Sequence, residues 1–317
     1  MKLLFAFFRL IRWPNLVFIA LTQSLFYYCI IVPSLPESYY HLQYTFTQPL
    51  FFILMLASVF IAAAGYIIND YFDINIDQVN KPEKMVVEKI IKRRWAIVLH
   101  WSITTAGLIL SLYVSFKTSV IIIIANVLCT LLLWFYSTSF KKKLLSGNVI
   151  ISILTAWTVL VLYFAANNTY HFGVNFSAEI FTAMNRIFKF AILYGGFAFI
   201  ISLVREVVKD IEDREGDARY SCKTMPIVWG VPASKVFAGV WLVVLIGALT
   251  IIQFYVFQLG WWLTAIYSLL LVILPLVWIL RKLYTAQNIS QYHQLSSVIK
   301  LVMLSGILSM IFFKIHV

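Results

Sequence analysis

The chain has 317 residues, of which 62% are hydrophobic and only 12% are charged, and its formal net charge is +12. A soluble domain carries about 25% charged residues, so this chain has too little charge to cover a water-facing surface. The composition excludes a soluble or disordered protein and predicts an all-α, polytopic membrane protein.

Nine apolar runs, each near the length of about 20 residues that a membrane-spanning helix needs, follow one another along the chain. They are Leu16–Val32, Leu50–Ile68, Ala96–Phe116, Ser119–Tyr136, Val149–Ala166, Phe188–Val204, Val236–Gln258, Trp261–Leu280 and Val298–Phe313. The least secure divisions are those at Lys117 and Gly260. Since no gap is long enough for a separate soluble domain, we expect one integral-membrane domain over residues 1–317.

The basic residues predict the orientation of the chain. With the N-terminus in the cytoplasm, 21 of the 25 Lys and Arg residues fall on the cytoplasmic side. Such an asymmetry sets orientation by the positive-inside rule. We therefore expect a multi-pass protein of the cell (inner) membrane whose positive charge faces anionic membrane lipids. Nucleic-acid binding is not expected, because the charge is dispersed over several connecting segments.

The acidic residues are even more unevenly distributed. Eleven of the 13 lie in two segments, 69–95 and 205–235, which we expect to be loops on the cytoplasmic side. Each segment repeats the spacing i, i+3, i+7: Asp70, Asp73 and Asp77 in the first, and Asp210, Asp213 and Asp217 in the second. On a helix this spacing gathers three carboxylates on one face.

Three like charges on one face repel each other, and a hard divalent cation removes that cost. Mg²⁺ prefers one or two carboxylates, several waters and substrate phosphate oxygens. The alternative interpretation is a solvated loop of mixed charge. Two copies at identical spacing on one side of the membrane favour a Mg²⁺ site that binds a diphosphate.

The same segments supply cations for phosphate oxygens. Lys81, Lys84 and Lys89 follow the first group of aspartates, whereas Arg205, Lys209, Arg214 and Lys223 are interleaved with the second. A third basic group, Lys141–Lys143, is expected on the same side. It either contacts phosphate or only determines topology.

The two acidic motifs resemble those of a known family. Asn69-Asp70-Tyr71-Phe72-Asp73, with Asp77, Asn80 and Pro82 after it, resembles the first aspartate-rich motif of the UbiA superfamily of intramembrane prenyltransferases. Asp210-Ile211-Glu212-Asp213-Arg214-Glu215-Gly216-Asp217, followed by Thr224 and Pro226, resembles the second. Weaker landmarks of the family are Arg12-Trp13-Pro14-Asn15, Tyr136-Ser137 and Asn148.

The resemblance implies an all-helical fold and a reaction. A polyprenyl diphosphate, held by Mg²⁺ between the two motifs, loses diphosphate, and an acceptor captures the allylic cation. The catalytic residues would be Asp70, Asp73, Asp210 and Asp213, and these would bind metal together with Asp77 and Asp217. The substrate-binding residues would be Asn15, Asn69, Asp77, Lys84, Lys141, Arg205, Lys209 and Asp217.

One stretch departs from the family pattern. Family members often continue the first motif with Pro-x-Arg-Pro and a Ser-Gly turn, but this chain has Pro82-Glu83-Lys84-Met85-Val86-Val87-Glu88-Lys89. Lys84 stands near the place of the arginine. A lysine is a point charge and not a bidentate phosphate ligand.

The acceptor is open at this stage. The second motif looks most like that of the branch that prenylates geranylgeranylglyceryl phosphate, whereas a competing branch prenylates aromatic acceptors such as 4-hydroxybenzoate, homogentisate or a naphthoate. A divalent-cation transporter is the alternative from another class. Transporters usually place ionisable residues at the bilayer midplane, but the runs proposed here contain no Asp or Glu.

Overall fold

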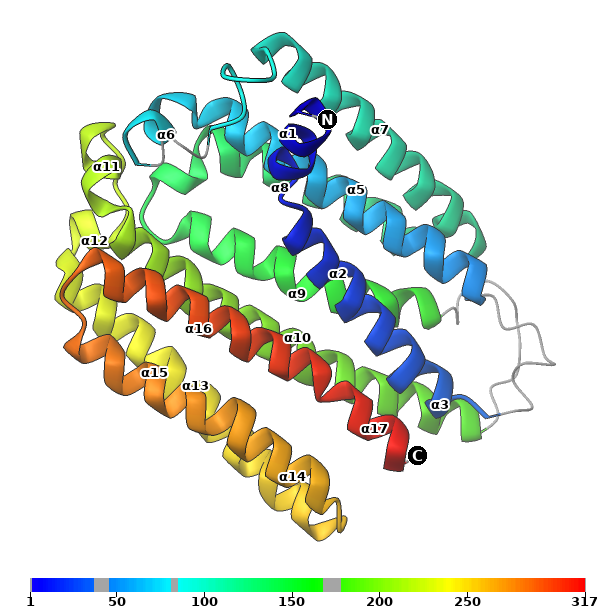
Figure 1. The fold of residues 1–317 in the computed structure, drawn as a ribbon. Coiled ribbons are helices and arrows are strands. Elements are labelled where there is room, and N and C mark those ends of the chain that lie inside the picture. The colour runs from blue at the N-terminus through cyan, green and yellow to red at the C-terminus, as the bar shows by residue number, and fades with distance from the viewer. Residues whose placement is uncertain (1, 37–45, 81–84, 168–177, 317) are drawn as a thin grey trace. The chain divides into compact units, whose positions relative to one another are not determined.

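The computed structural model describes residues 2–36, 46–80, 85–167 and 178–316. Apart from one isolated bridge between Val87 and Ile91, the regular structure of these residues is helical (Figure 1). Within them, nine helical segments are long and apolar enough to cross a membrane. The predicted all-α, polytopic fold with nine spans is confirmed.

The helices follow one another in the order shown in Figure 1. The first part of the chain forms α1 (Lys2–Leu10), α2 (Trp13–Phe26), α3 (Val32–Ser34), α5 (Gln48–Phe72), α6 (Ile74–Asn80), α7 (Arg93–Lys117) and α8 (Val120–Thr138). The second part forms α9 (Ser146–Ala166), α10 (Ala178–Glu212), α11 (Arg214–Arg219), α12 (Met225–Val228), α13 (Gly230–Gln258), α14 (Trp262–Ser268), α15 (Leu274–Thr285), α16 (Ile289–Leu308) and α17 (Met310–His316).

Two spans contain a π-helical turn just before a proline. The turn Tyr27–Ile31 leads into Pro33 of α3, and the turn Leu269–Ile273 leads into Pro275 of α15. Proline has no N–H and its ring clashes with the carbonyl four residues earlier. A wider turn removes that clash without ending the helix, so α2 continues into α3 and α14 into α15.

Both of the insecure divisions are real helix ends. Helix α7 ends at Lys117, and α8 begins after Ser119, whose hydroxyl accepts a hydrogen bond from the N–H of Ile121 at 3.3 Å. Gly260 separates α13 from α14 in a left-handed conformation, with φ of 72°. A left-handed residue at this position is a common helix terminator, and glycine adopts it without steric cost.

Helix α10 is much longer than its predicted span, Phe188–Val204. It has 35 residues and so measures about 52 Å, well beyond a hydrocarbon core of about 30 Å. Its polar ends therefore continue the helix outside the apolar layer.

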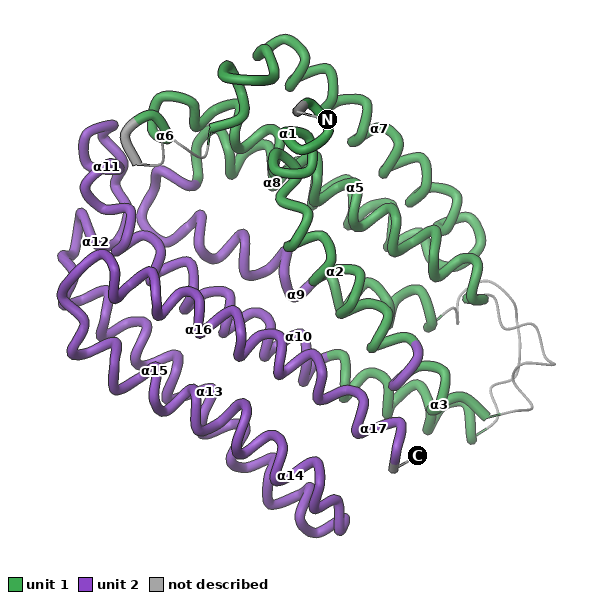
Figure 2. Tube along the Cα trace, viewed as in Figure 1, with its two compact units in different colours: residues 1–27, 31–140, 158–191 green, residues 28–30, 141–157, 192–317 purple. Residues whose placement is uncertain are grey.

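The chain divides into two compact units (Figure 2). Unit 1 comprises Met1–Tyr27, Ile31–Phe140 and Thr158–Ala191, and unit 2 comprises Tyr28–Ile30, Lys141–Trp157 and Ile192–Val317. In unit 1, α5 packs against α2, α7 and α8; in unit 2, α15 packs against α13 and α16. The first aspartate motif belongs to unit 1 and the second to unit 2. A single domain over residues 1–317 stays a prediction.

Candidate active site

Both aspartate motifs begin inside a helix. Asp70 lies in the last turn of α5, and Asp210 lies in the last turn of α10. The expectation of loops over 69–95 and 205–235 was wrong in large part, because α5 and α6 occupy most of residues 69–80 and α10 to α13 occupy most of residues 205–235. Buried residues just before each motif, such as Ile67 and Val207, keep the helix packed against its neighbours up to the carboxylates.

The two motifs share one backbone geometry. Helix α5 ends one residue before Asp73, where φ is −89° and ψ is −1°, and α10 ends one residue before Asp213, where φ is −89° and ψ is 3°. A short helix follows each bend, α6 in the first case and α11 in the second. The helical hydrogen-bond pattern crosses both bends: the N–H of Asp73 donates to the carbonyl of Asn69 at 3.0 Å, and that of Asp213 donates to the carbonyl of Lys209 at 2.8 Å. Residues at i, i+3 and i+7 of each motif are thus spaced as they are on one face of a helix.

The first aspartate of the first motif, Asp70, contacts Arg12, which lies between α1 and α2. Arg12, in a left-handed conformation with φ of 51°, donates from Nη2 to Oδ1 of Asp70 at 2.8 Å. Its guanidinium carbon lies 5.1 Å from the centre of the Tyr66 ring. Burial lowers the pKa of Arg12, but Asp70, Tyr66 and Asp77 together raise it above its usual value, so this side chain stays charged.

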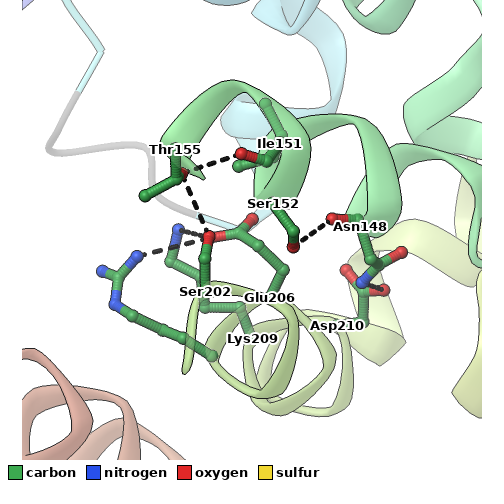
Figure 3. A network of polar contacts seen from close by, with 9 residues as sticks. Asn148, Ile151, Ser152, Thr155, Ser202, Glu206, Lys209 and Asp210 are labelled. Carbon is green, nitrogen blue, oxygen red and sulfur yellow. Dashed lines mark hydrogen bonds and ion pairs between the residues drawn. The ribbon is translucent and has the colours of Figure 1, made fainter. Parts of the chain in front are cut away.

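The second motif is bound to the first turn of α9 (Figure 3). Asn148 donates from Nδ2 to Oδ2 of Asp210 at 2.8 Å, and the hydroxyl of Ser152 donates to the Asn148 carbonyl at 2.6 Å. Farther along the same pair of helices, the hydroxyls of Thr155 and Ser202 form a hydrogen bond of 3.2 Å. These contacts fix α9 against α10 beside the carboxylate.

Two of the predicted phosphate-binding cations meet one carboxylate of α10. Arg205 lies 3.3 Å from Oε1 of Glu206. Lys209 lies 3.0 Å from the same atom (Figure 3). Arg205 and Lys209 therefore share the carboxylate of Glu206, which lies about one turn before Asp210. A phosphate group would compete with Glu206 for both cations.

The available donors suit a magnesium ion better than a softer metal. Asn69 donates to Asp73 Oδ2 at 2.8 Å, and its own carbonyl oxygen is buried without a hydrogen-bond partner among the described residues. In that part of the chain, no three His, Cys, Asp or Glu side chains lie close enough to form a complete metal site. Mg²⁺ is usually held by one or two carboxylates together with water and phosphate oxygens, so this incomplete set of hard oxygen donors fits it.

The remaining predicted residues lie in several places. Asp77 is in α6 and Asp217 in α11, whereas Asn15 is in the first turn of α2. Lys141 belongs to the 3₁₀ turn Phe140–Lys142, and the N–H of Lys223 donates to the Lys142 carbonyl at 2.7 Å, so this turn is tied to the segment after α11. Lys84 lies outside the described residues.

From the sequence, Arg12 and Asn148 were landmarks of the family without an assigned role. They stand 58 and 62 residues before the aspartates that they contact, each at the start of a helix. The two separations are similar, but they can be recognised as contacts only once the packing of the helices is known.

The departure from the family pattern has a physical explanation. Met85, Val86 and Val87 are buried in one apolar cluster with Ala6 and Leu10 of α1. Glu88 then adopts a left-handed conformation with φ of 71°, and its N–H donates to the carbonyl of Ile91 at 2.9 Å. A tight turn is therefore formed without glycine, and the apolar cluster keeps it in place.

A cavity of about 530 Å³ lies in unit 2 behind the second motif. Ile211 and Glu212 line it, together with Lys235 of α13 and Tyr284 of α15, but Asp210 and Asp213 do not. Lys235 donates to the Tyr284 carbonyl at 3.3 Å and thereby neutralises the end of α15. The cavity is thus lined by residues of the second motif, but not by its three aspartates.

Comparisons with known proteins agree on one family. The sequence pattern of the UbiA prenyltransferase family matches residues 15–298. A digeranylgeranylglyceryl phosphate synthase of Haloquadratum walsbyi is 34% identical over 70% of this chain and 70% of its own length. The enzyme of that name from Methanosphaera stadtmanae is 27% identical over 81% of this chain and 85% of its own length.

Solved structures show the same fold. A structure described as digeranylgeranylglyceryl phosphate synthase in membranes covers 98% of this chain and 99% of its own, with a TM-score of 0.62 and 24% identity. A UbiA homologue from Archaeoglobus fulgidus, bound to GPP and Mg²⁺, covers 96% of this chain and 99% of its own, with a TM-score of 0.56 and 16% identity.

Proposed function

This chain belongs to the UbiA prenyltransferase family, and from that premise we propose that it transfers a geranylgeranyl group from its diphosphate to a membrane-associated acceptor, with Mg²⁺ as the cofactor. The observation that carries the proposal is the repeated motif. Two long helices, α5 and α10, each end in the same bend, and the aspartates at i, i+3 and i+7 lie in the long helix, at the bend and in the short helix after it. Membership of a prenyltransferase family also argues against the alternative that the protein is a divalent-cation transporter.

We assign the metal to the aspartates of both motifs, Asp70, Asp73, Asp77, Asp210, Asp213 and Asp217, acting on the same diphosphate. When bound, Mg²⁺ supplies positive charge that stabilises the departing diphosphate. Asn69 orients Asp73 through its hydrogen bond of 2.8 Å. Arg205 and Lys209 exchange Glu206 for phosphate oxygens, and Lys84, Lys141 and Asn15 are assigned to substrate binding as well.

The bond between the allylic carbon and the diphosphate oxygen breaks, and the electron pair leaves with the diphosphate. A hydroxyl oxygen of the acceptor then bonds to the allylic carbon, and its proton passes to the released diphosphate, which yields an ether. Burial of the isoprenoid chain among apolar helices keeps water, the competing nucleophile, away from the cation.

Geranylgeranylglyceryl phosphate is the acceptor that we favour. Relatives that are 27–34% identical carry the name digeranylgeranylglyceryl phosphate synthase. A lipid phosphate also suits an interface with surplus cations such as Arg214 and the Lys141–Lys143 group. An aromatic acceptor would carry at most one carboxylate.

We further propose that the N-terminus and both motifs face the cytoplasm and that the protein resides in the cell membrane. This rests on the distribution of the basic residues, 21 of 25 on one side in the nine-span arrangement.

The test is a product analysis with purified protein in detergent. Labelled geranylgeranyl diphosphate and Mg²⁺ are incubated with geranylgeranylglyceryl phosphate, 4-hydroxybenzoate, homogentisate and a naphthoate in separate reactions. We expect labelled ether lipid in the first reaction alone, and none when EDTA exceeds Mg²⁺. Label in an aromatic product alone would establish the aromatic alternative.

A further inference from the structure

The first aspartate of each motif accepts a hydrogen bond from a side chain at the start of an earlier helix. Arg12 precedes α2 and contacts Asp70, and Asn148 lies in the first turn of α9 and contacts Asp210, both at 2.8 Å. Each contact lies within one unit, so unit 1 and unit 2 each contain a hydrogen bond of this kind. We propose that Arg12 and Asn148 are positioning residues that fix the carboxylates of Asp70 and Asp210 for the metal–diphosphate complex, an inference that rests on the proposed function.

Both positioning side chains are themselves held in place. The left-handed backbone of Arg12 is fixed by hydrogen bonds on either side: its N–H donates to the Arg9 carbonyl at 3.1 Å, and its carbonyl accepts from the N–H of Asn15 at 2.8 Å. Its guanidinium also lies on the ring of Tyr66, one turn before Asp70. Asn148 is only 7% exposed. Such constraint lowers the entropy that a carboxylate loses when it adopts one orientation.

Each contact occupies only one carboxylate oxygen. Arg12 binds Oδ1 of Asp70, and Asn148 binds Oδ2 of Asp210. The other oxygen of each group retains the capacity to ligate a metal or a metal-bound water. Outer partners of this kind orient metal ligands, and their loss typically costs 10–100-fold in metal affinity or activity.

The two partners differ in charge, and this gives the two aspartates different roles. Arg12 is a permanent cation, so it neutralises Asp70 and leaves less net negative charge for a metal in the first motif. Asn148 is neutral, so its contact adds no opposing charge to Asp210. Loss of Asn148 should therefore act mainly on Mg²⁺ affinity, whereas loss of Arg12 should act mainly on the rate of transfer.

The test compares Asn148→Ala and Arg12→Met with two control variants. Asn126 is 3% exposed and donates to the Ser111 hydroxyl at 2.8 Å, so Asn126→Ala removes an equally buried amide elsewhere. Arg94→Ala removes an exposed cation from α7. The readouts are the Kd of Mg²⁺, measured by titration calorimetry with geranylgeranyl thiodiphosphate present, and kcat and KM for geranylgeranyl transfer.

We expect Asn148→Ala to raise the Kd of Mg²⁺ about tenfold or more, and Arg12→Met to lower kcat about tenfold or more. Arg12→Lys, which keeps a cationic donor, should restore part of the rate. Both control variants should keep the Kd and kcat of the wild type. A shift as large in Asn126→Ala as in Asn148→Ala would show a structural effect and overturn the inference.

Double variants separate positioning from direct contact with the substrate. If Arg12 acts through Asp70, Arg12→Met should add nothing to Asp70→Asn, and Asn148→Ala should add nothing to Asp210→Asn. Multiplicative losses would overturn the inference while leaving the proposed function intact. Absence of transfer by the wild-type protein would instead contradict the proposed function.

Discussion

Asp73 and Asp213 have the same backbone conformation, with φ of −89° at both and ψ within a few degrees of zero, one residue after the end of a long helix. Each is also the second aspartate of its motif. Because the bend keeps the helical hydrogen bonds on both sides, a short helix carries the third aspartate onward in register. The identical spacing of the two motifs therefore reflects an identical local structure.

The four aspartates assigned to catalysis should each be required. We expect Asp70→Asn, Asp73→Asn, Asp210→Asn and Asp213→Asn to lower kcat/KM for geranylgeranyl diphosphate by at least about 100-fold, because each removes charge that stabilises the leaving diphosphate. Asp77→Asn and Asp217→Asn should have smaller effects. Glu179→Gln, an exposed acid in the first turn of α10, is the control and should be neutral. Steady-state kinetics on folded, monodisperse variants would decide this.

The turn at Glu88 should be improved by glycine. Glu88 is exposed and left-handed, with φ of 71°, a conformation that costs a residue with a side chain roughly 1–2 kcal/mol. We expect Glu88→Gly to raise the free energy of unfolding by up to about 1 kcal/mol, after the larger backbone entropy of glycine is deducted. Thermal unfolding in detergent measures it. Lys89→Gly, one position later, should give no gain; equal gains at both positions would exclude strain at Glu88 as the cause.

Two helical glycines should respond oppositely to alanine. A Cβ atom on Gly306 of α16 would overlap the ring of Phe197, whereas one on Gly247 of α13 would meet no atom within 4 Å. We expect Gly306→Ala to destabilise the protein by about 1–3 kcal/mol through overpacking, and Gly247→Ala to be neutral or stabilising by up to about 1 kcal/mol. Unchanged thermal stability of Gly306→Ala would contradict the close packing of α16 on α10.

Cysteine labelling tests the orientation. Cysteines introduced at Lys84 and Arg214 should react with a membrane-impermeant maleimide from the cytoplasmic side only, and one introduced at Asn168 from the opposite side only. Reaction of the first two from opposite faces would exclude a shared diphosphate.

The native cysteines should give little background in that experiment. All three, Cys29, Cys129 and Cys222, are buried. Burial raises the pKa of the Cys222 thiol, and the nearby Asp217 carboxylate raises it further. Because the thiolate is the reactive form, labelling of Cys222 should be slow at neutral pH and should increase as the pH rises. Rapid reaction of the wild-type protein at pH 7 would contradict this burial.

Features that depend on local sequence could be predicted, and those that depend on distant contacts could not. The apolar runs and the breaks at Lys117 and Gly260 follow from composition and local turn chemistry, and so do the two aspartate triplets. The partners of Asp70 and Asp210 stand 58 and 62 residues away, so no local pattern reveals them. The extension of α10 to Glu212 was also missed, because charged residues end an apolar run without ending a helix.

The central claim is that both motifs act on one diphosphate, and a double-mutant cycle between Asp73 and Asp213 tests it most directly. We would measure kcat/KM for geranylgeranyl diphosphate in the wild type, in Asp73→Asn, in Asp213→Asn and in the double variant, at saturating Mg²⁺. Groups that act as a unit give non-additive losses, so the double variant should be little worse than either single one. Losses that multiply would show that the two aspartates act independently and would contradict the account.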